Sequence, residues 1–160
     1  MRKFQLFPLA DLIAEVKNTA AVEAQARGCI FTVPAVDTGI YIDVDRHLLL
    51  SAVGNVLQRV FEFSDDHTEV ILNAYSVADR VLIDVVDTCG GLPPGDAEKM
   101  FLPFTQTGED QSGLGSGLSI AWRCVESNNG VLSVRDVPDI GCLFTINLPR
   151  YANDGNANTT

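Results

Sequence analysis

Two glycine-rich segments interrupt the second half of this chain and constrain its fold more than any other feature. The first begins at Asp87 and reads Asp-Thr-Cys-Gly-Gly-Leu-Pro-Pro-Gly as far as Gly95. The second covers residues 113–118, reads Gly-Leu-Gly-Ser-Gly-Leu, and directly precedes a stretch that can form a helix. Because glycine lets a backbone approach a ligand without an intervening Cβ atom, these segments predict functional loops between a strand and a helix.

Length and composition indicate one globular domain. With 160 residues, 46% hydrophobic and 20% charged, the chain can bury a single sizeable core. We expect the domain to span residues 1–150 and residues 151–160 to form a disordered tail. The net charge of −10 argues against nucleic acid as a partner. No apolar run approaches the roughly 20 residues of a membrane helix, so we expect a cytoplasmic domain without direct membrane contact.

The cysteines and histidines suggest no metal centre. The four cysteines are scattered without a Cys-x-x-Cys pair, which favours reduced thiols; they are Cys29, Cys89, Cys124 and Cys142. The run Asp65-Asp66-His67 could be drawn as a metal cluster, but consecutive residues rarely face one ion. A solvated loop is the favoured interpretation there.

The first half of the chain predicts two helices and three short strands. A helix is expected from Leu9 to about Arg27, ended by Gly28. Apolar residues then recur at three- and four-residue steps from 45 to 63, which predicts an amphipathic helix capped by Asp45. The strand candidates are Phe4–Phe7, Cys29–Val33 and Gly39–Ile42.

The second half predicts an antiparallel hairpin, a third helix and a final strand pair. The hairpin strands are Glu69–Tyr75 and Arg80–Val86, joined by residues 76–79. The helix opens near Gly117 and ends at about Ser127, and the last pair is Val131–Arg135 with Cys142–Leu148 around Pro138-Asp139. These elements predict an α+β fold: a two-layer α/β sandwich with a mixed, mostly antiparallel sheet and helices on one face.

The chemistry of the loops suits an adenine nucleotide. Asp87 follows a strand, and a carboxylate there can accept a hydrogen bond from an exocyclic amine, although an ordinary Asp-Gly-Gly turn is an open alternative. The glycines of 113–117 precede a helix whose first N–H groups would face a phosphate. A dinucleotide-binding interpretation is poor, because that motif comes early in its fold and is followed by a strand-end acid.

Four motifs in order resemble the ATP-binding catalytic domain of sensor histidine kinases, which has the Bergerat type of ATP fold. Residues 55–64 are similar to the N box, Asp87 to Gly91 to the G1 box, Phe101-x-Pro103-Phe104 to the F box, and residues 113–118 to the G2 box. Residues 145–149 are like the closing strand of that family, so the resemblance covers about residues 4–150.

The resemblance implies a ligand, a set of contacts and partners. The ligand is ATP or ADP, with residues 105–112 as a lid, and Asn55 is the implied Mg²⁺ ligand. The implied partners are a His-containing dimerisation domain, of the same or a partner kinase, and a response regulator. The implied nucleotide contacts are Asn55, Arg59, Asp87, Gly91, Leu92, Phe104, Gly113, Leu114, Gly115, Gly117 and Leu118.

The phosphate side departs from the family pattern. Arg59 replaces the second N-box Asn, Glu62 replaces a Lys, and residues 105–112 contain no Lys or Arg. A guanidinium has no lone pair for Mg²⁺ but can pair with phosphate oxygens, or alternatively with Glu62 as a solvated residue. No catalytic residue is assigned, and whether the chain is an enzyme stays open. The alternatives are a working histidine kinase domain and a chaperone- or topoisomerase-type ATPase, besides a pseudokinase module. The pseudokinase would bind adenine nucleotide weakly, without Mg²⁺ or not at all, and act through protein contacts.

Overall fold

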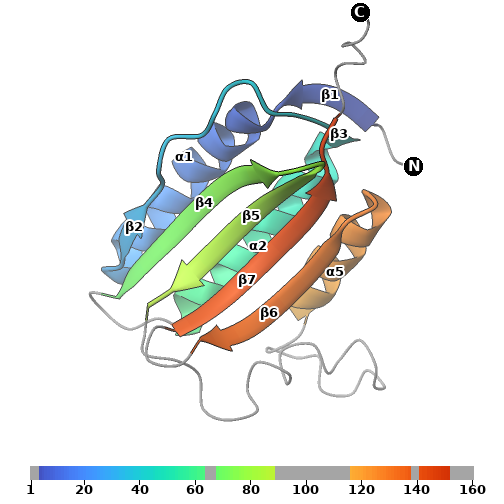
Figure 1. The fold of residues 1–160 in the computed structure, drawn as a ribbon. Helices are drawn as coiled ribbons and strands as arrows, with labels where there is room; N and C mark the ends of the chain where they lie inside the picture. The colour runs from blue at the N-terminus through green and yellow to red at the C-terminus, as the bar shows by residue number, and fades with distance from the viewer. Residues whose placement is uncertain (1–3, 64–67, 89–115, 138–140, 152–160) are drawn as a thin grey trace, which may run out of the picture.

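A five-stranded sheet with helices packed on one face makes up the two layers of the fold (Figure 1). The computed structural model describes residues 4–63, 68–88, 116–137 and 141–151. The strand order is β2-β4-β5-β7-β6, in which β2 pairs parallel with β4 and the other neighbours are antiparallel. This arrangement confirms the predicted two-layer α+β sandwich.

The described helices and strands follow the predicted order along the chain. The helices are α1 Leu9–Arg27, α2 Arg46–Phe63 and α5 Ser116–Ser127. The strands of the main sheet are β2 Ile30–Thr32, β4 Glu69–Val77, β5 Arg80–Asp87, β6 Val131–Val137 and β7 Gly141–Pro149. A second, two-stranded antiparallel sheet pairs β1 Phe4–Pro8 with β3 Tyr41–Asp45.

The ends of α1 and α2 follow from local sequence chemistry. Gly28 has a φ of 73°, the left-handed conformation that glycine adopts most readily, and it ends α1 as predicted. Asp45 precedes α2, and its Oδ1 atom accepts the backbone N–H of Leu48 at 3.2 Å, so the predicted cap is confirmed. None of the described helices is long and apolar enough to cross a membrane.

Alternation along the central strands builds the core. In β4, β5 and β7 every second side chain is buried toward the helices, including Leu72, Ile83 and Phe144. The opposite face of the sheet carries half-buried side chains, among them Tyr75, whose hydroxyl donates to Asp84 Oδ2 at 2.7 Å. The core therefore lies between the sheet and the helices.

Several strand boundaries differ from the expectation. The hairpin strands extend further than predicted, to Val77 and Asp87, and leave a turn of two residues in which Ala78 has a φ of 55°. The strand expected at Gly39–Ile42 lies instead at Tyr41–Asp45, because its pairing with β1 fixes its limits. The predicted turn at Pro138-Asp139 and the loop 65–67 lie outside the described residues, as does the predicted tail 151–160 except Tyr151, whose N–H donates to the Tyr41 carbonyl oxygen at 3.0 Å.

The described cysteines behave as expected. Cys29, Cys124 and Cys142 are buried thiols that form no disulfide, and Cys89 lies outside the described residues. No group of three or more His, Cys, Asp or Glu side chains in the described part of the chain could hold a metal ion.

Candidate functional site

The described site residues gather at one end of the molecule. Helices α2 and α5 run antiparallel, since the start of α2 meets the end of α5, where Asp45 N–H donates to Asn128 Oδ1 at 2.6 Å. The C-terminal half of α2, the N-terminus of α5 and the C-terminal end of β5 therefore lie at the same end (Figure 1). These three places carry Asn55 with Arg59, Gly117 with Leu118, and Asp87.

Asp87 is a buried carboxylate at the end of a central strand. Its side chain is 1% exposed, and its backbone pairs with Val70 on one side and Cys142 on the other. The next residue, Thr88, donates to the carbonyl oxygen of Glu69 through both its N–H at 3.1 Å and its hydroxyl at 2.8 Å. A carboxylate held in this way, out of bulk water, favours a hydrogen-bond donor as its ligand.

Gly141 leaves room for the backbone of Asp87. A Cβ atom at position 141 would lie 1.5 Å from the Asp87 carbonyl oxygen, and Gly141 has a φ of 152°. Only glycine fits this close approach. The sequence does not predict this role of Gly141, because a single glycine after a turn has no local pattern that indicates its neighbour.

Asn55 and Arg59 lie one turn apart on α2. The Nδ2 atom of Asn55 donates to Ser51 Oγ at 3.5 Å, a long hydrogen bond. Arg59 Nη1 lies 3.0 Å from Glu62 Oε1, so the pairing offered as an alternative from the sequence is present. The side chain of Arg59 is only 12% exposed, however, so the solvated position expected with that pairing is wrong.

The described residues do not fit a protein-held Mg²⁺ ion. Asn55 offers one carbonyl oxygen, while Arg59 carries a positive charge and no lone pair. Glu62, the carboxylate one turn away, is already engaged with Arg59. The chemistry of this set therefore suits an anion near Arg59 better than a cation.

The N-terminus of α5 provides the third part of the site. The helix begins at Ser116, so Gly117 belongs to its first turn, and Leu118 is fully buried in the core. Burial of Leu118 fixes the first turn, whose backbone N–H groups and helix dipole favour a phosphate. The other predicted contacts lie outside the described residues, as does the predicted lid 105–112; they are Gly91, Leu92, Phe104, Gly113, Leu114 and Gly115.

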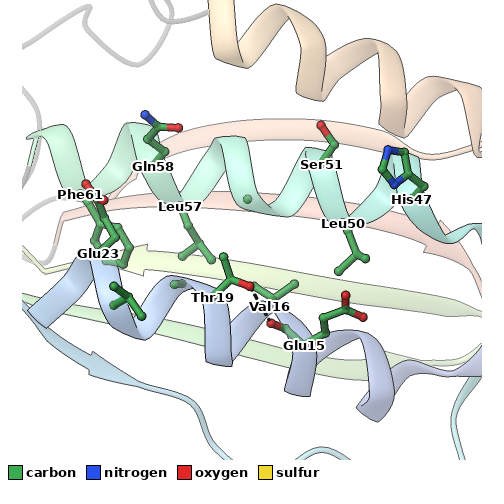
Figure 2. A pocket seen from close by; sticks show the side chains of 13 residues that line it. Glu15, Val16, Thr19, Glu23, His47, Leu50, Ser51, Leu57, Gln58 and Phe61 are labelled. Carbon is green, nitrogen blue, oxygen red and sulfur yellow. Dashed lines mark hydrogen bonds between the residues drawn. The ribbon is translucent and has the colours of Figure 1, made fainter.

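A groove between α1 and α2 lies apart from these residues. It encloses about 670 Å³, and Figure 2 shows Val16, Leu50 and Leu57 within it, with Glu15 and His47 toward one end. Asn55, Arg59 and Asp87 do not line it. Its glutamates form ion pairs, Glu15 with Arg46 and Glu23 with Arg27. The sequence does not predict this groove, because its shape depends on how the two helices pack.

The chain matches known proteins in sequence and in fold. Residues 44–152 match the family described as histidine kinase-, DNA gyrase B- and HSP90-like ATPases. The chain is 28% identical over 151 residues to the alginate biosynthesis sensor protein KinB of Pseudomonas aeruginosa, covering 93% of this chain and 25% of KinB. It is 30% identical over 149 residues to the sensor histidine kinase ZraS of Salmonella typhi, covering 92% of this chain and 32% of ZraS. The chain thus spans about a quarter to a third of these relatives.

Solved structures show the same fold. The catalytic domain of the histidine kinase ThkA superposes with a TM-score of 0.76 at 21% identity, covering 92% of this chain and 95% of that domain. The full-length kinase ShkA, solved in complex with AMPPNP, gives a TM-score of 0.75 at 23% identity, covering 94% of this chain and 32% of ShkA. The chain therefore belongs to the family of histidine kinase-, DNA gyrase B- and HSP90-like ATPases, with sensor histidine kinases as its relatives.

Proposed function

We propose that this chain is the ATP-binding catalytic domain of a two-component sensor histidine kinase and acts in the cytoplasm. The observation that carries the proposal is the position of Asp87. This carboxylate is 1% exposed and lies at the end of the molecule where the N-box helix α2 ends and the helix α5 begins. In a chain of this ATPase family, that arrangement provides an adenine acceptor beside a phosphate-binding helix end.

Each part of the site has a distinct task in this proposal. The Asp87 carboxylate accepts a hydrogen bond from the adenine amine, which selects adenine over guanine. The first turn of α5, with Gly117, holds phosphate oxygens through backbone N–H groups. Asn55 and Arg59 face the phosphates from α2, Arg59 through its guanidinium. The glycines of the two loops, Gly91 and Gly113 among them, complete the contacts as the resemblance implies.

The proposed reaction transfers the γ-phosphoryl group of ATP to a histidine on a separate dimerisation domain. A response regulator would then receive the phosphoryl group. One solved relative, ThkA, was crystallised in complex with a response regulator protein, TrrA. Positive charge near the moving phosphoryl group lowers the barrier of such a transfer, and in this proposal Arg59 provides that charge.

The Arg59–Glu62 pair favours a second candidate function, a pseudokinase that binds adenine nucleotide without Mg²⁺. Arg59 stands where the family has a metal ligand, and its guanidinium is held by a neighbouring carboxylate at 3.0 Å. Such a site can retain a nucleotide while lacking the metal that phosphoryl transfer uses. The module would then act through contacts with partner domains.

Calorimetric titration with ADP and ATP, each with Mg²⁺ and with EDTA, tests both functions. Micromolar binding of either nucleotide supports the nucleotide site, and no binding under any condition rejects it. Dependence on Mg²⁺ favours the kinase, because catalysis needs the metal, while binding that is equal in EDTA favours the pseudokinase.

A transfer assay then separates the two directly. The purified domain is mixed with [γ-³²P]ATP and the His-containing dimerisation domain of a relative such as KinB. Labelling of that histidine, lost when it is replaced by alanine, supports the kinase. Nucleotide binding without labelling favours the pseudokinase.

A further inference from the structure

We propose that Asn128 is a positioning residue for the nucleotide site, acting as a pivot that sets the angle between α2 and α5. Its relation to nucleotide affinity rests on the proposed function. Gly117 lies at the opposite end of α5 from the pivot, and Asn55 lies halfway along α2. Asn128 would therefore act on the site through the helices that it joins.

The amide of Asn128 bridges the two helices with both of its polar atoms. Its Oδ1 atom accepts the backbone N–H of Asp45 at 2.6 Å, and its Nδ2 atom donates to the carbonyl oxygen of Cys124 at 2.8 Å. The side chain is 1% exposed. In this water-poor position each hydrogen bond is costly to lose, because the released group cannot turn to solvent.

Both contacts fall on helix ends that need them. Cys124 is one of the last four residues of α5, whose carbonyl oxygens have no partner within the helix ladder. Asp45 is the capping residue of α2, since its Oδ1 atom accepts the N–H of Leu48. Asn128 thus holds a residue that itself fixes the first turn of α2, and connects positions 83 residues apart in the sequence.

Because the helices are long, a small rotation at the pivot causes a larger displacement of the site residues. Asn55 lies about 15 Å along α2 from Asp45, and Gly117 about 17 Å along α5 from Asn128, at 1.5 Å per residue. Rotating one helix by about 5° about the pivot moves its far end by about 1.4 Å. A displacement of that size between the parts of a binding site is enough to weaken binding markedly.

At the site end, α5 is held by apolar packing. Leu118 anchors α5 there by burial of an apolar side chain, which is non-directional, whereas the Asn128 bonds fix direction. The Asn128 bonds therefore add a directional constraint to the apolar packing that holds the two helices together.

Substitution of Asn128 tests the proposal. Asn128→Asp keeps the acceptor for Asp45 N–H, removes the donor to Cys124, and places a negative charge near the Asp45 carboxylate. Asn128→Ser is a milder change that keeps a small polar group. We expect at least a tenfold weaker ADP affinity in Asn128→Asp by calorimetry and a smaller loss in Asn128→Ser. The matched control is Ala24→Gly. This substitution lowers the free energy of unfolding through a buried position on α1, and it leaves the bonds of Asn128 to Asp45 and Cys124 in place.

Amide NMR spectra of the nucleotide-free proteins give a second readout. We expect the backbone amide signals of Asn55, Gly117 and Leu118 to shift in both Asn128 variants and to stay in place in Ala24→Gly. A lower melting temperature with unchanged ADP affinity and unmoved far-end signals would overturn the proposal. If the wild-type protein binds no ADP, the proposed function fails, and the far-end amide shifts still decide whether Asn128 sets the helix geometry.

Discussion

Arg59 and Glu62 form an ion pair one turn apart on α2, with Nη1 and Oε1 separated by 3.0 Å. The two residues replace an Asn and a Lys of the resembled N box. A cation followed by an anion therefore stands where the family pattern has a neutral ligand followed by a cation. Because the side chain of Arg59 is only 12% exposed, its position is fixed and water screens its charge less than it would at the surface. The pair therefore places a fixed cation where the family pattern has a metal ligand.

Replacing Arg59 by Asn should introduce Mg²⁺ dependence. Arg59→Asn adds a second carbonyl oxygen one turn from Asn55 and removes the repelling charge. We expect the ratio of the ATP dissociation constant in EDTA to that in Mg²⁺ to be about tenfold higher in Arg59→Asn than in the wild-type protein, a change of about 1.4 kcal/mol. Calorimetric titration measures this ratio.

Arg59→Ala is the control for that experiment. It removes the cation without adding a ligand, so the affinity for ATP should fall in both buffers and the ratio should stay at its wild-type value. An Arg59→Asn variant with the same ratio of dissociation constants as the wild-type protein would contradict the role assigned to Arg59.

Replacing Asp87 by Asn should weaken selection of adenine. An amide presents a donor as well as an acceptor, so the variant can no longer offer two acceptor oxygens to an amine. We expect at least a tenfold loss of ADP affinity and a smaller preference for ADP over GDP. Since Asp87 is buried, urea unfolding of the variant must accompany the titration. Unchanged ADP affinity in a folded variant would refute the assignment.

Two glycine-to-alanine substitutions should change stability in opposite directions. Gly141→Ala places a Cβ atom 1.5 Å from the Asp87 carbonyl oxygen, so we expect a loss above about 3 kcal/mol in the free energy of unfolding, or no folded protein. Gly54→Ala, in the middle of α2 with nothing within 4 Å of its added Cβ, should gain about 0.5–1 kcal/mol. Urea unfolding at constant pH compares the two variants, and a similar sign for both would count against the described backbone approach.

Deprotonation of Tyr75 should lower the free energy of unfolding in strong alkali. Burial, then its hydrogen bond to the Asp84 carboxylate, raises the pKa of Tyr75 from 10 to about 12. The neutral phenol is favoured in the folded state, so its stabilisation is complete below pH 10 and is lost as pH rises from 10 to about 12. Absorbance at alkaline pH, compared between wild type and Tyr75→Phe, should show that the substitution removes a phenol titration centred at about pH 12.

Asp84→Asn is the matched change for Tyr75. It removes the charge of the partner and leaves burial, the larger cause, in place. The pKa of Tyr75 should therefore move toward 10 without reaching it. An unchanged late titration would show that Asp84 has no part in the shift.

Local patterns predicted the elements whose causes are local. The cap at Asp45, the stop at Gly28 and the alternation of β4 and β5 each depend on residues within a few positions of one another. The start of α5 near Gly117 was predicted for the same reason. The ordered motifs placed Asp87 at a strand end, and the structure has it there as the last residue of β5.

Local sequence patterns did not predict the long-range contacts. The pairing of β1 with β3, the bond from Asp45 to Asn128 and the passage of Gly141 against Asp87 join residues between 33 and 83 positions apart. Asn128 was identified only as part of a helix end, because nothing in its immediate neighbours indicates its partner. The burial of Arg59 was missed because helix periodicity does not show what packs over a given turn.

The small β1–β3 sheet brings the two described ends of the domain together. Phe4 pairs with Asp45 at one end of β3, and Tyr151 N–H donates to the Tyr41 carbonyl oxygen at the other, at 3.0 Å. The two ends are therefore separated along β3 by four residue steps, about 13 Å. A linker of about six residues could join them, so a circular permutant with new termini opened in the Ala78-Asp79 turn should keep the sheet order while changing where the chain begins.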